Sequence, residues 1–231
     1  MLINIFKGRI PKNTEKQENI ELSWLKNLEK WNRDWGDVSR RINYNLNEKS
    51  IVFDIGGYKG QWASDIYAKY HCTLYIFEPI KKYANFIKKR FSSHNNIHVL
   101  SMGASITNHS RFLYIDNEKS STNIESEAAK SKRTKVKMTD LCKYIKDNNI
   151  KHIDLMKINI EGDEYDLLNK IISTETVKCI DNLQVQFHRF IDDSVNRRLE
   201  IRKLLRKTHK QTYNYPFIWE NWEIKNAGKN V

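Results

Sequence analysis

Residues 51 to 60 read IVFDIGGYKG, and this stretch is the most informative in the chain. It opens with three apolar residues, Ile51 to Phe53, as a strand buried on both faces of a parallel sheet requires. Asp54 follows, then glycines at positions 56, 57 and 60, and then a stretch typical of a helix. Glycines at a strand-to-helix turn let the backbone bend sharply and let a ligand approach the main chain. The stretch therefore predicts a ligand site at the end of a buried strand.

A second strand signal follows about 20 residues later. Residues 73 to 77 (TLYIF) are largely apolar and end in Glu78, which precedes a proline. An acidic side chain at this place can accept hydrogen bonds from both hydroxyls of a ribose. Together the two strand ends predict a site for an adenosine-containing cofactor. The competing interpretation is a glycine-rich turn in some other α/β protein, with Glu78 facing solvent.

The order of acid and glycines indicates which cofactor to expect. Dinucleotide-binding folds use G-x-G-x-x-G, which lets a pyrophosphate rest on the helix N-terminus. Here the order is Asp-x-Gly-x-x-x-Gly, from Asp54 through Gly56 to Gly60. An acid repels pyrophosphate but suits the ammonium group of S-adenosylmethionine, which carries no phosphate. We expect Asp54 to hold the methionyl end of this cofactor and Glu78 to hold the ribose.

Length and composition favour one globular domain with an N-terminal extension. The chain has 231 residues, of which 39% are hydrophobic and 11% aromatic, enough for a core. We expect a helical extension over residues 1–49 and the cofactor-binding domain over residues 50–231. No signal peptide and no run of the ~20 apolar residues that span a bilayer are present, so a cytoplasmic protein is expected.

The formal net charge of +12 is compatible with nucleic acid, an anionic membrane or a phosphorylated substrate. The alternative is coding drift in an AT-rich genome, because lysine, asparagine and isoleucine are abundant throughout. The three cysteines are widely spaced and have no histidine cluster beside them. They predict neither a disulfide framework nor a zinc site, and no metal site is expected.

Helices and strands are expected to alternate along most of the chain. Apolar residues at helical spacing predict one or two helices over 15 to 35, with Trp24, Trp31 and Trp35 packing on the sheet. Strands are expected near 97–101, 153–160 and 183–187, a β-ribbon at 111–115, a loop at 116–132 and two antiparallel strands in the tail. Helices are expected at 81–90, at 140–147 with Thr139 as N-cap, after Glu164 in a short helix that ends near residue 172, and at 193–207. Gly103 and Ala104 are expected in a turn beside the adenine ring.

With these elements in place, the chain resembles the FkbM-type family of S-adenosylmethionine-dependent methyltransferases over roughly residues 50 to 190. The resemblance rests on VFDIGGYKG, FEP, LMKINIEGDEYDLL and QVQFH, of which the third is the most specific. It implies a class I (Rossmann-like) α/β fold with a seven-stranded, mostly parallel sheet, here with N-terminal helices added. It also implies methyl transfer, usually to an oxygen of a sugar or natural product. The tail FIWENW resembles a subset associated with polysaccharide gene clusters.

Two positions depart from the family pattern. Tyr58 stands where many members have asparagine, which alters the methionine end of the expected pocket. Asn159 stands where many have aspartate, which removes a potential base and weakens a metal-assisted mechanism. The expected cofactor-binding residues are Asp54, Gly56, Tyr58, Gly60, Glu78 and Ala104.

Candidate catalytic residues lie where the fourth and fifth strands end. In an open α/β sheet, side chains at the carboxyl ends of the strands face the ligand, which selects Asn159, Glu161 and His188. His188 is the preferred general base because imidazole can take a hydroxyl proton near neutral pH; the alternative is a histidine that orients a loop. Glu161 could instead anchor the turn through backbone amides, and Asn159 is expected to contact cofactor or substrate. Asp163, Glu164 and Asp166 are expected to form a solvated helix face.

The sequence therefore predicts an O-methyltransferase that acts on a hydroxyl of a sugar or nucleotide-linked sugar in bacterial surface polysaccharide biosynthesis. The acceptor would be a small molecule or glycan, and an anionic one would suit the basic chain. A nucleic-acid methyltransferase is the main alternative. Amino-methylating enzymes of that class often have an Asn/Asp-Pro-Pro-aromatic loop after strand four, whereas here Asn159 is followed by Ile-Glu-Gly. A non-catalytic binding protein that retains the fold is the third interpretation.

Overall fold

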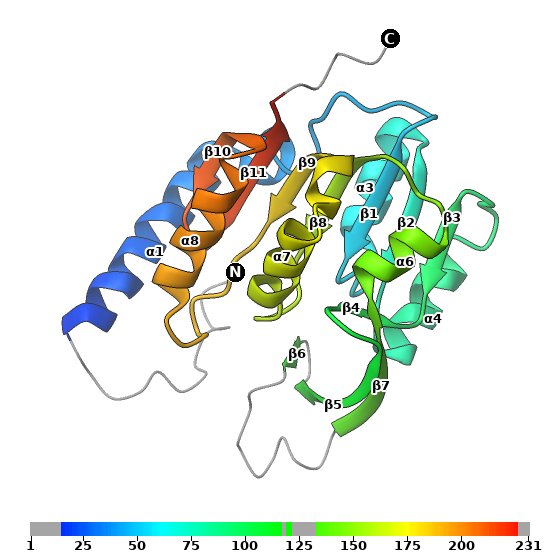
Figure 1. Ribbon diagram of the computed structural model, residues 1–231, viewed down its shortest axis with the longest axis horizontal. Coiled ribbons are helices and arrows are strands. Elements are labelled where there is room, and N and C mark those ends of the chain that lie inside the picture. The colour runs from blue at the N-terminus through cyan, green and yellow to red at the C-terminus, as the bar shows by residue number, and fades with distance from the viewer. Residues whose placement is uncertain (1–14, 117–118, 122–132, 226–231) are drawn as a thin grey trace.

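The computed structural model describes residues 15–116, 119–121 and 133–225 of the chain (Figure 1). Its centre is a seven-stranded sheet in the order β10-β11-β9-β8-β1-β2-β3. The five strands from β9 to β3 pair in parallel, whereas β11 is antiparallel to β9 and β10 is antiparallel to β11. The strands are β1 (Ile51–Ile55), β2 (Thr73–Phe77), β3 (Ile97–Leu100), β8 (Ile153–Ile158), β9 (Ile180–Val185), β10 (His209–Tyr215) and β11 (Trp219–Ile224). The predicted seven-stranded, mostly parallel Rossmann-like sheet is confirmed.

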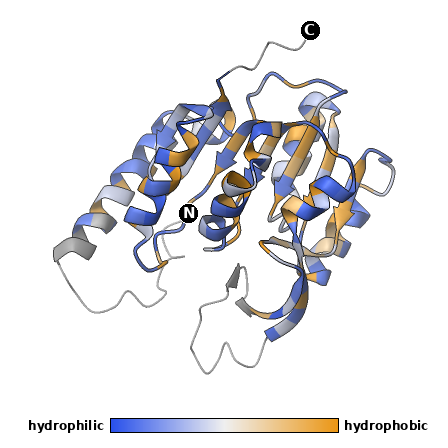
Figure 2. Cartoon of the chain, viewed as in Figure 1, coloured by the Kyte–Doolittle hydropathy of each residue, from blue (hydrophilic) through white to orange (hydrophobic). Residues whose placement is uncertain are grey.

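Helices cover both faces of this sheet because its strands are apolar on both sides. Along β1, Val52 packs on one face and Phe53 with Ile55 on the other, as the two-residue period of a strand dictates. The Val52 face is covered by α3 (Gln61–Tyr70) and α4 (Lys81–Arg90). The Phe53 face is covered by α6 (Leu141–Asp147), α7 (Glu164–Ser173) and α8 (Ser194–Leu205). Figure 2 shows hydrophobic residues gathered in the central strands between these layers.

The N-terminal helices pack at the β10 edge of the sheet. They are α1 (Glu15–Arg33) and the short α2 (Gly36–Ser39). Trp31 is buried against Tyr215 of β10, their ring centroids 5.1 Å apart and nearly perpendicular. Trp35 lies between the two helices in a left-handed conformation and is 75% exposed, so the prediction that it packs on the sheet was wrong. None of the described helices is long and apolar enough to cross a membrane.

A second, four-stranded sheet lies beside the carboxyl ends of the main strands, at the bottom of Figure 1. It has the order β4-β7-β5-β6 and consists of β4 (Gly103–Ser105), β5 (His109–Asp116), β6 (Lys119–Ser121) and β7 (Arg133–Asp140). Only part of β5 was predicted, as a ribbon. Strand β7 was missed because lysine and arginine occupy its outer face, although Val136 and Met138 alternate inward against the start of α4.

Three local predictions in this region were wrong. The 116–132 segment contains strand β6, and the rest of it, apart from Asp116, lies outside the described residues. Gly103 and Ala104 belong to β4 rather than to a turn. The N-cap of α6 is Asp140, whose carboxylate accepts a hydrogen bond from the Lys143 amide, whereas Thr139 is the penultimate residue of β7.

The core makes one stability prediction. Phe53 is fully buried between β2 and the helices of its face, whereas Phe86 on α4 is 49% exposed. We expect Phe53→Ala to lower the free energy of unfolding by about 3–5 kcal/mol, because it removes buried apolar surface and leaves a cavity. The matched change Phe86→Ala is expected to cost less than ~1 kcal/mol. Urea unfolding of both variants measures the difference, and equal losses would contradict this assignment of the core.

Candidate active site

The candidate site lies at the carboxyl ends of four adjacent strands. Asp54 is in β1, Glu78 follows β2, Asn159 and Glu161 follow β8, and His188 follows β9. Because β2, β1, β8 and β9 are neighbours in the sheet, the fold brings the predicted cofactor-binding residues and the predicted catalytic residues to the same end of the strands. The Asn159 amide donates to the Ile55 carbonyl oxygen at 3.0 Å, which joins the β8 end to the glycine turn.

A buried ion pair anchors the cofactor end of this edge. Lys157 of β8 lies directly opposite Asp54 of β1, and its Nζ donates to Asp54 Oδ1 and to the Gly56 carbonyl oxygen, each at 2.8 Å. Asp54 is fully buried, and burial raises its pKa, while the charge and hydrogen bond of Lys157 oppose that rise. Asp54 Oδ2 is buried and has no hydrogen-bond partner among the described residues. One carboxylate oxygen therefore remains available for a donor on a ligand.

The turn after Asp54 requires glycine. Gly56 has φ +91°, and a Cβ there would lie 2.0 Å from the carbonyl oxygen of Asn159. Gly60 precedes α3 with φ +74°, so the turn leads directly into the helix. Tyr58 also adopts a left-handed conformation, and its ring stands edge-on to Tyr83 with centroids 4.8 Å apart. The turn thus exposes main chain without side chains at its glycines and carries the aromatic ring of Tyr58 beside them.

Glu78 faces this turn rather than solvent. Its carboxylate is 4% exposed and accepts hydrogen bonds from the amides of Tyr58, at 2.7 Å, and Ile80, at 2.8 Å. Burial raises the pKa of Glu78 to about 7, against the opposing effect of the two backbone hydrogen bonds. A carboxylate has about four acceptor positions, so two more hydrogen bonds are possible. The interpretation of Glu78 as a solvent-facing residue does not fit this burial.

The catalytic candidates form a second group. His188 is nearly buried, and its Nε2 lies 3.5 Å from Glu161 Oε2. Glu161 has φ 53° and is followed by Gly162 with φ +113°, where a Cβ would lie 2.4 Å from Ile191 Cδ1. This left-handed pair of residues directs Glu161 back toward the end of β9. The structure therefore brings Glu161 and His188 together.

Asn159 lies between the two groups. Its backbone carbonyl packs against Gly56, and its side-chain Oδ1 is buried without a hydrogen-bond partner among the described residues. A buried amide oxygen without a partner costs free energy, so this atom is a second open acceptor in the site. Ala104, expected beside an adenine, is 2% exposed and packs in the main core.

Glu164 corrects the prediction of a solvated helix face. Its side chain is fully buried, and Oε1 accepts hydrogen bonds from the His188 backbone amide at 2.8 Å and pairs with His188 Nδ1 at 3.1 Å. Oε2 accepts from the Gly162 amide at 2.9 Å, so Glu164 and not Glu161 anchors the turn through backbone amides. Burial alone would raise the pKa of Glu164, but the charge and hydrogen bonds of His188 bring it below its ordinary value. Of the other two acids, Asp166 is exposed and pairs with Arg197.

Two ion pairs attach surrounding elements to the catalytic group. Arg111 of β5 pairs with Asp163, the N-cap of α7, and so holds the second sheet against the turn. Arg189 follows His188, makes a two-point ion pair with Glu21 of α1 and lies 4.2 Å from the Trp24 ring centroid. The second sheet and α1 therefore lie beside the Glu161 and His188 end of the candidate site.

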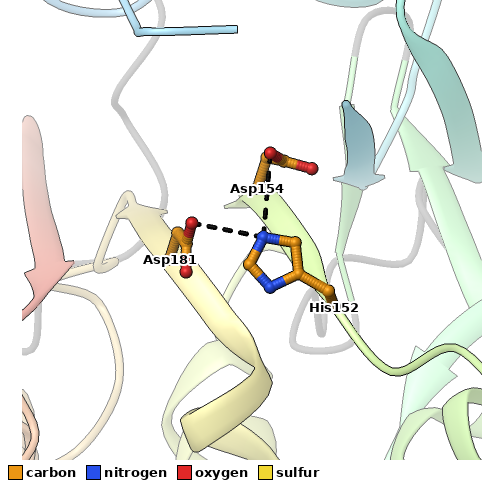
Figure 3. A group of neighbouring side chains, drawn as sticks. All are labelled: His152, Asp154 and Asp181. Atoms are coloured by element: carbon orange, nitrogen blue, oxygen red, sulfur yellow. Dashed lines mark ion pairs between the residues drawn. The ribbon is translucent and has the colours of Figure 1, made fainter. Parts of the chain in front are cut away.

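A separate group of possible metal ligands, drawn in Figure 3, lies at the opposite ends of the strands, where β1, β8 and β9 start. His152 Nε2 is 3.2 Å from Asp181 Oδ2 and 3.7 Å from Asp154 Oδ1. Asp154 also accepts hydrogen bonds from the Ile51 amide and the Ser50 hydroxyl. These contacts connect the starts of β1, β8 and β9, so the group stabilises the strand ends that lie away from the candidate site.

Sequence reasoning missed Lys157 and Glu164 as members of the site. A signal was present for Lys157, because a lysine inside the apolar strand LMKINI is rarely buried without a partner. Glu164 carried no such signal, since a glutamate in the first turn of a helix is usual at the surface.

The ion pair generates a first prediction for the site. We expect Lys157→Met to lower the free energy of unfolding at pH 7 by about 3–5 kcal/mol, because it leaves the Asp54 carboxylate buried without a counter-charge. The double variant Asp54→Asn with Lys157→Met is expected to recover most of that loss. Urea unfolding of the two variants tests this, and a double variant as unstable as the single one would contradict it.

Glu78 generates a second prediction, in the pH dependence of stability. Its pKa is about 7 in the folded protein against an ordinary value of 4.5, so the folded state keeps a proton that the unfolded chain has lost. The resulting stabilisation is complete below pH 4.5 and is lost as the pH rises through 7. We expect the difference in unfolding free energy between wild type and Glu78→Gln to fall by up to ~3 kcal/mol across this range. A difference independent of pH would show that Glu78 does not titrate this way.

Comparisons with known proteins place the chain in a family. Solved structures with a related arrangement include a putative rRNA methylase from Clostridium thermocellum, at 9% identity and TM-score 0.45, covering 78% of this chain and 90% of that one. M. capricolum TrmK in complex with S-adenosylhomocysteine is another, at 11% identity and TM-score 0.44, covering 78% and 65%. Likenesses this weak carry no argument about substrate, and no curated protein sequence matches. The family model of the methyltransferase FkbM domain matches residues 54–215, well over half of the chain, and the protein therefore belongs to the FkbM methyltransferase family.

Proposed function

We propose that the protein is an S-adenosylmethionine-dependent O-methyltransferase that acts on a hydroxyl of a sugar or nucleotide-linked sugar in bacterial surface polysaccharide biosynthesis. The observation that carries the proposal is the buried Asp54 Oδ2, which has no hydrogen-bond partner among the described residues. It lies beneath a glycine turn whose Tyr58 amide donates to Glu78, at the end of the next strand. The proposal includes the cytoplasmic location expected from the sequence.

The chain's own residues fit this cofactor. Asp54 Oδ2 offers an acceptor for the ammonium of the methionyl end, and Lys157 keeps that carboxylate ionised by balancing its charge. The free positions on the Glu78 carboxylate suit ribose hydroxyls. The backbone of Gly56 and Gly60 lets the ligand approach closely, and Tyr58 borders the methionine end. When bound, S-adenosylmethionine supplies an activated methyl group on a cationic sulfur.

The remaining task of the protein is to align the acceptor hydroxyl and remove its proton. We assign proton removal to His188, whose Nε2 faces the turn that bears Glu161. In this role Nε2 would take the proton of the acceptor hydroxyl, and the bound cofactor would supply the methyl group and keep the electron pair of the broken carbon–sulfur bond on its sulfur. Asn159 Oδ1, the second open acceptor, would hold a donor group of the cofactor or of the acceptor.

A nucleic-acid acceptor is the second candidate, and one surface favours it. The outer face of β5 and β7 carries the exposed residues Arg133, Lys135 and Lys137, with the Phe112 ring 50% exposed among them. Basic side chains interleaved with an aromatic ring are typical of surfaces that bind single-stranded nucleic acid. Residues 159 to 162 lack the proline-containing loop that grips an exocyclic amine, so this candidate would be limited to ribose or phosphate oxygens. A non-catalytic protein would not need an open acceptor on Asp54.

Transfer of label from isotopically labelled S-adenosylmethionine tests the proposal. Nucleotide-sugars and polysaccharide extract are offered in one series, and total RNA and DNA in another. We expect label in the carbohydrate series. Label in nucleic acid alone would overturn the acceptor assignment, and no cofactor binding by calorimetry would favour the non-catalytic interpretation.

With an acceptor in hand, His188→Ala tests the assignment of the base. We expect kcat to fall by about 10²- to 10⁴-fold, while the dissociation constant for S-adenosylmethionine changes by less than about twofold. Thermal unfolding confirms that the variant is folded. Full activity in a folded variant would remove His188 as the base.

A further inference from the structure

The contacts of Glu164 exceed what an anchor for a turn requires. Its fully buried carboxylate lies within hydrogen-bond distance of three nitrogens, which belong to the Gly162 amide, the His188 backbone amide and the His188 ring. The two amides alone would hold the β8–α7 turn and the end of β9 together. The third contact is directed at a side chain that the proposed function uses.

These contacts determine which ring nitrogen carries the proton. An ionised carboxylate only accepts hydrogen bonds, and the two backbone amides that converge on Glu164 stabilise its ionised form. His188 Nδ1, 3.1 Å from Oε1, must therefore be the donor. When the imidazole is neutral, its lone pair is therefore on Nε2. Glu161 Oε2 lies 3.5 Å from Nε2, where a carboxylate stabilises the imidazolium that forms when Nε2 takes a proton.

The ring is also held in place from other directions. The Tyr165 hydroxyl donates to the His188 carbonyl oxygen at 2.7 Å, so α7 fixes the backbone on both sides of the side chain. The Phe190 ring packs beside the imidazole, with centroids 5.2 Å apart. Rotation of the ring about χ2 by 180° would put Cδ2 in the place of Nδ1 and lose the contact with Glu164.

We propose that Glu164 is a positioning residue that holds His188 in the Nδ1-protonated tautomer and directs Nε2 at the methyl acceptor. The inference rests on the proposed function for what Nε2 does, but the tautomer itself does not depend on it. Glu164 touches neither cofactor nor acceptor in this role. Its effect is exerted through the His188 ring alone.

The direct test is the protonation state of His188 in the folded wild-type protein without ligands. Long-range ¹H–¹⁵N spectra of ¹⁵N-labelled protein report which ring nitrogen carries the proton, and the signal is assigned by its absence in His188→Ala. Above the titration midpoint of the ring we expect the proton on Nδ1, although Nε2 is the favoured site in free histidine. A predominant Nε2–H form would overturn the proposal, whether or not methyl transfer has been detected.

The variant test uses Glu164→Gln with Asp166→Asn as its matched control. Both changes remove one carboxylate charge from the first turn of α7, but Asp166 is exposed and distant from the ring contact. A glutamine must point its NH₂ group at either the Gly162 or the His188 amide, both of which are donors, so it cannot reproduce the carboxylate's contacts. We expect Glu164→Gln to lower kcat by about 10- to 10²-fold with KM within about twofold, and Asp166→Asn to retain wild-type values.

The pH profile separates positioning from a merely structural role. Among the described residues, the carboxylates in contact with the His188 ring are those of Glu164 of α7 and Glu161 of the preceding turn. Because a nearby carboxylate favours the imidazolium, removing Glu164 is expected to move the acidic limb of the kcat profile to lower pH. An unmoved limb, or a loss confined to KM, would overturn the proposal. If Glu164→Gln fails to fold, the wild-type spectrum alone decides.

Discussion

Lys157 donates to both the Asp54 carboxylate and the Gly56 carbonyl oxygen, so one ammonium group joins two neighbouring strands and the turn that follows them. Taking both charges out of water is costly, and the cost is offset only because the pair lies in register and its hydrogen bonds are short. The arrangement leaves Asp54 Oδ2 without a partner among the described residues, directly below the turn. The same contact therefore fixes the strand ends and leaves an open acceptor.

Three buried carboxylates at this edge have different electrostatic environments. Asp54 is balanced by a lysine, Glu78 by two backbone amides, and Glu164 by two amides and a histidine. Burial raises the pKa of Glu78 to about 7. At Glu164 burial also acts to raise the pKa, but the charge of protonated His188 and the hydrogen bonds from that residue outweigh it and bring the pKa below its ordinary value. Burial acts to raise the pKa of each acid, and the donors that each one meets decide how far that rise is offset.

The acceptor side of the site is built from elements outside the main sheet. The second sheet is attached through Arg111 and Asp163, and α1 through Glu21 and Arg189. Both attachments fall within a few residues of Glu161 or His188. In the proposed function, the cofactor would be held at the carboxyl ends of the main strands, and the acceptor by the second sheet and α1. The exposed side chains of Arg133, Lys135 and Lys137 make the outer face of β7 basic, which would suit an anionic acceptor.

The sequence by itself determined the parallel sheet, the glycine turn and the approximate ends of its main strands. Strand periodicity, glycines at positions with positive φ and acids at strand ends are local signals. Asp54, Glu78, Glu161 and His188 were selected as candidates through local signals of this kind, and their roles stay predictions. The expected boundary at residue 49 stays a prediction. Only the tertiary structure decided which groups meet: Lys157 with Asp54, Glu164 with His188, and β7 with β5. These pairings join residues 19 to 103 positions apart, and the free energy of burying a charge depends on the partner that the fold supplies.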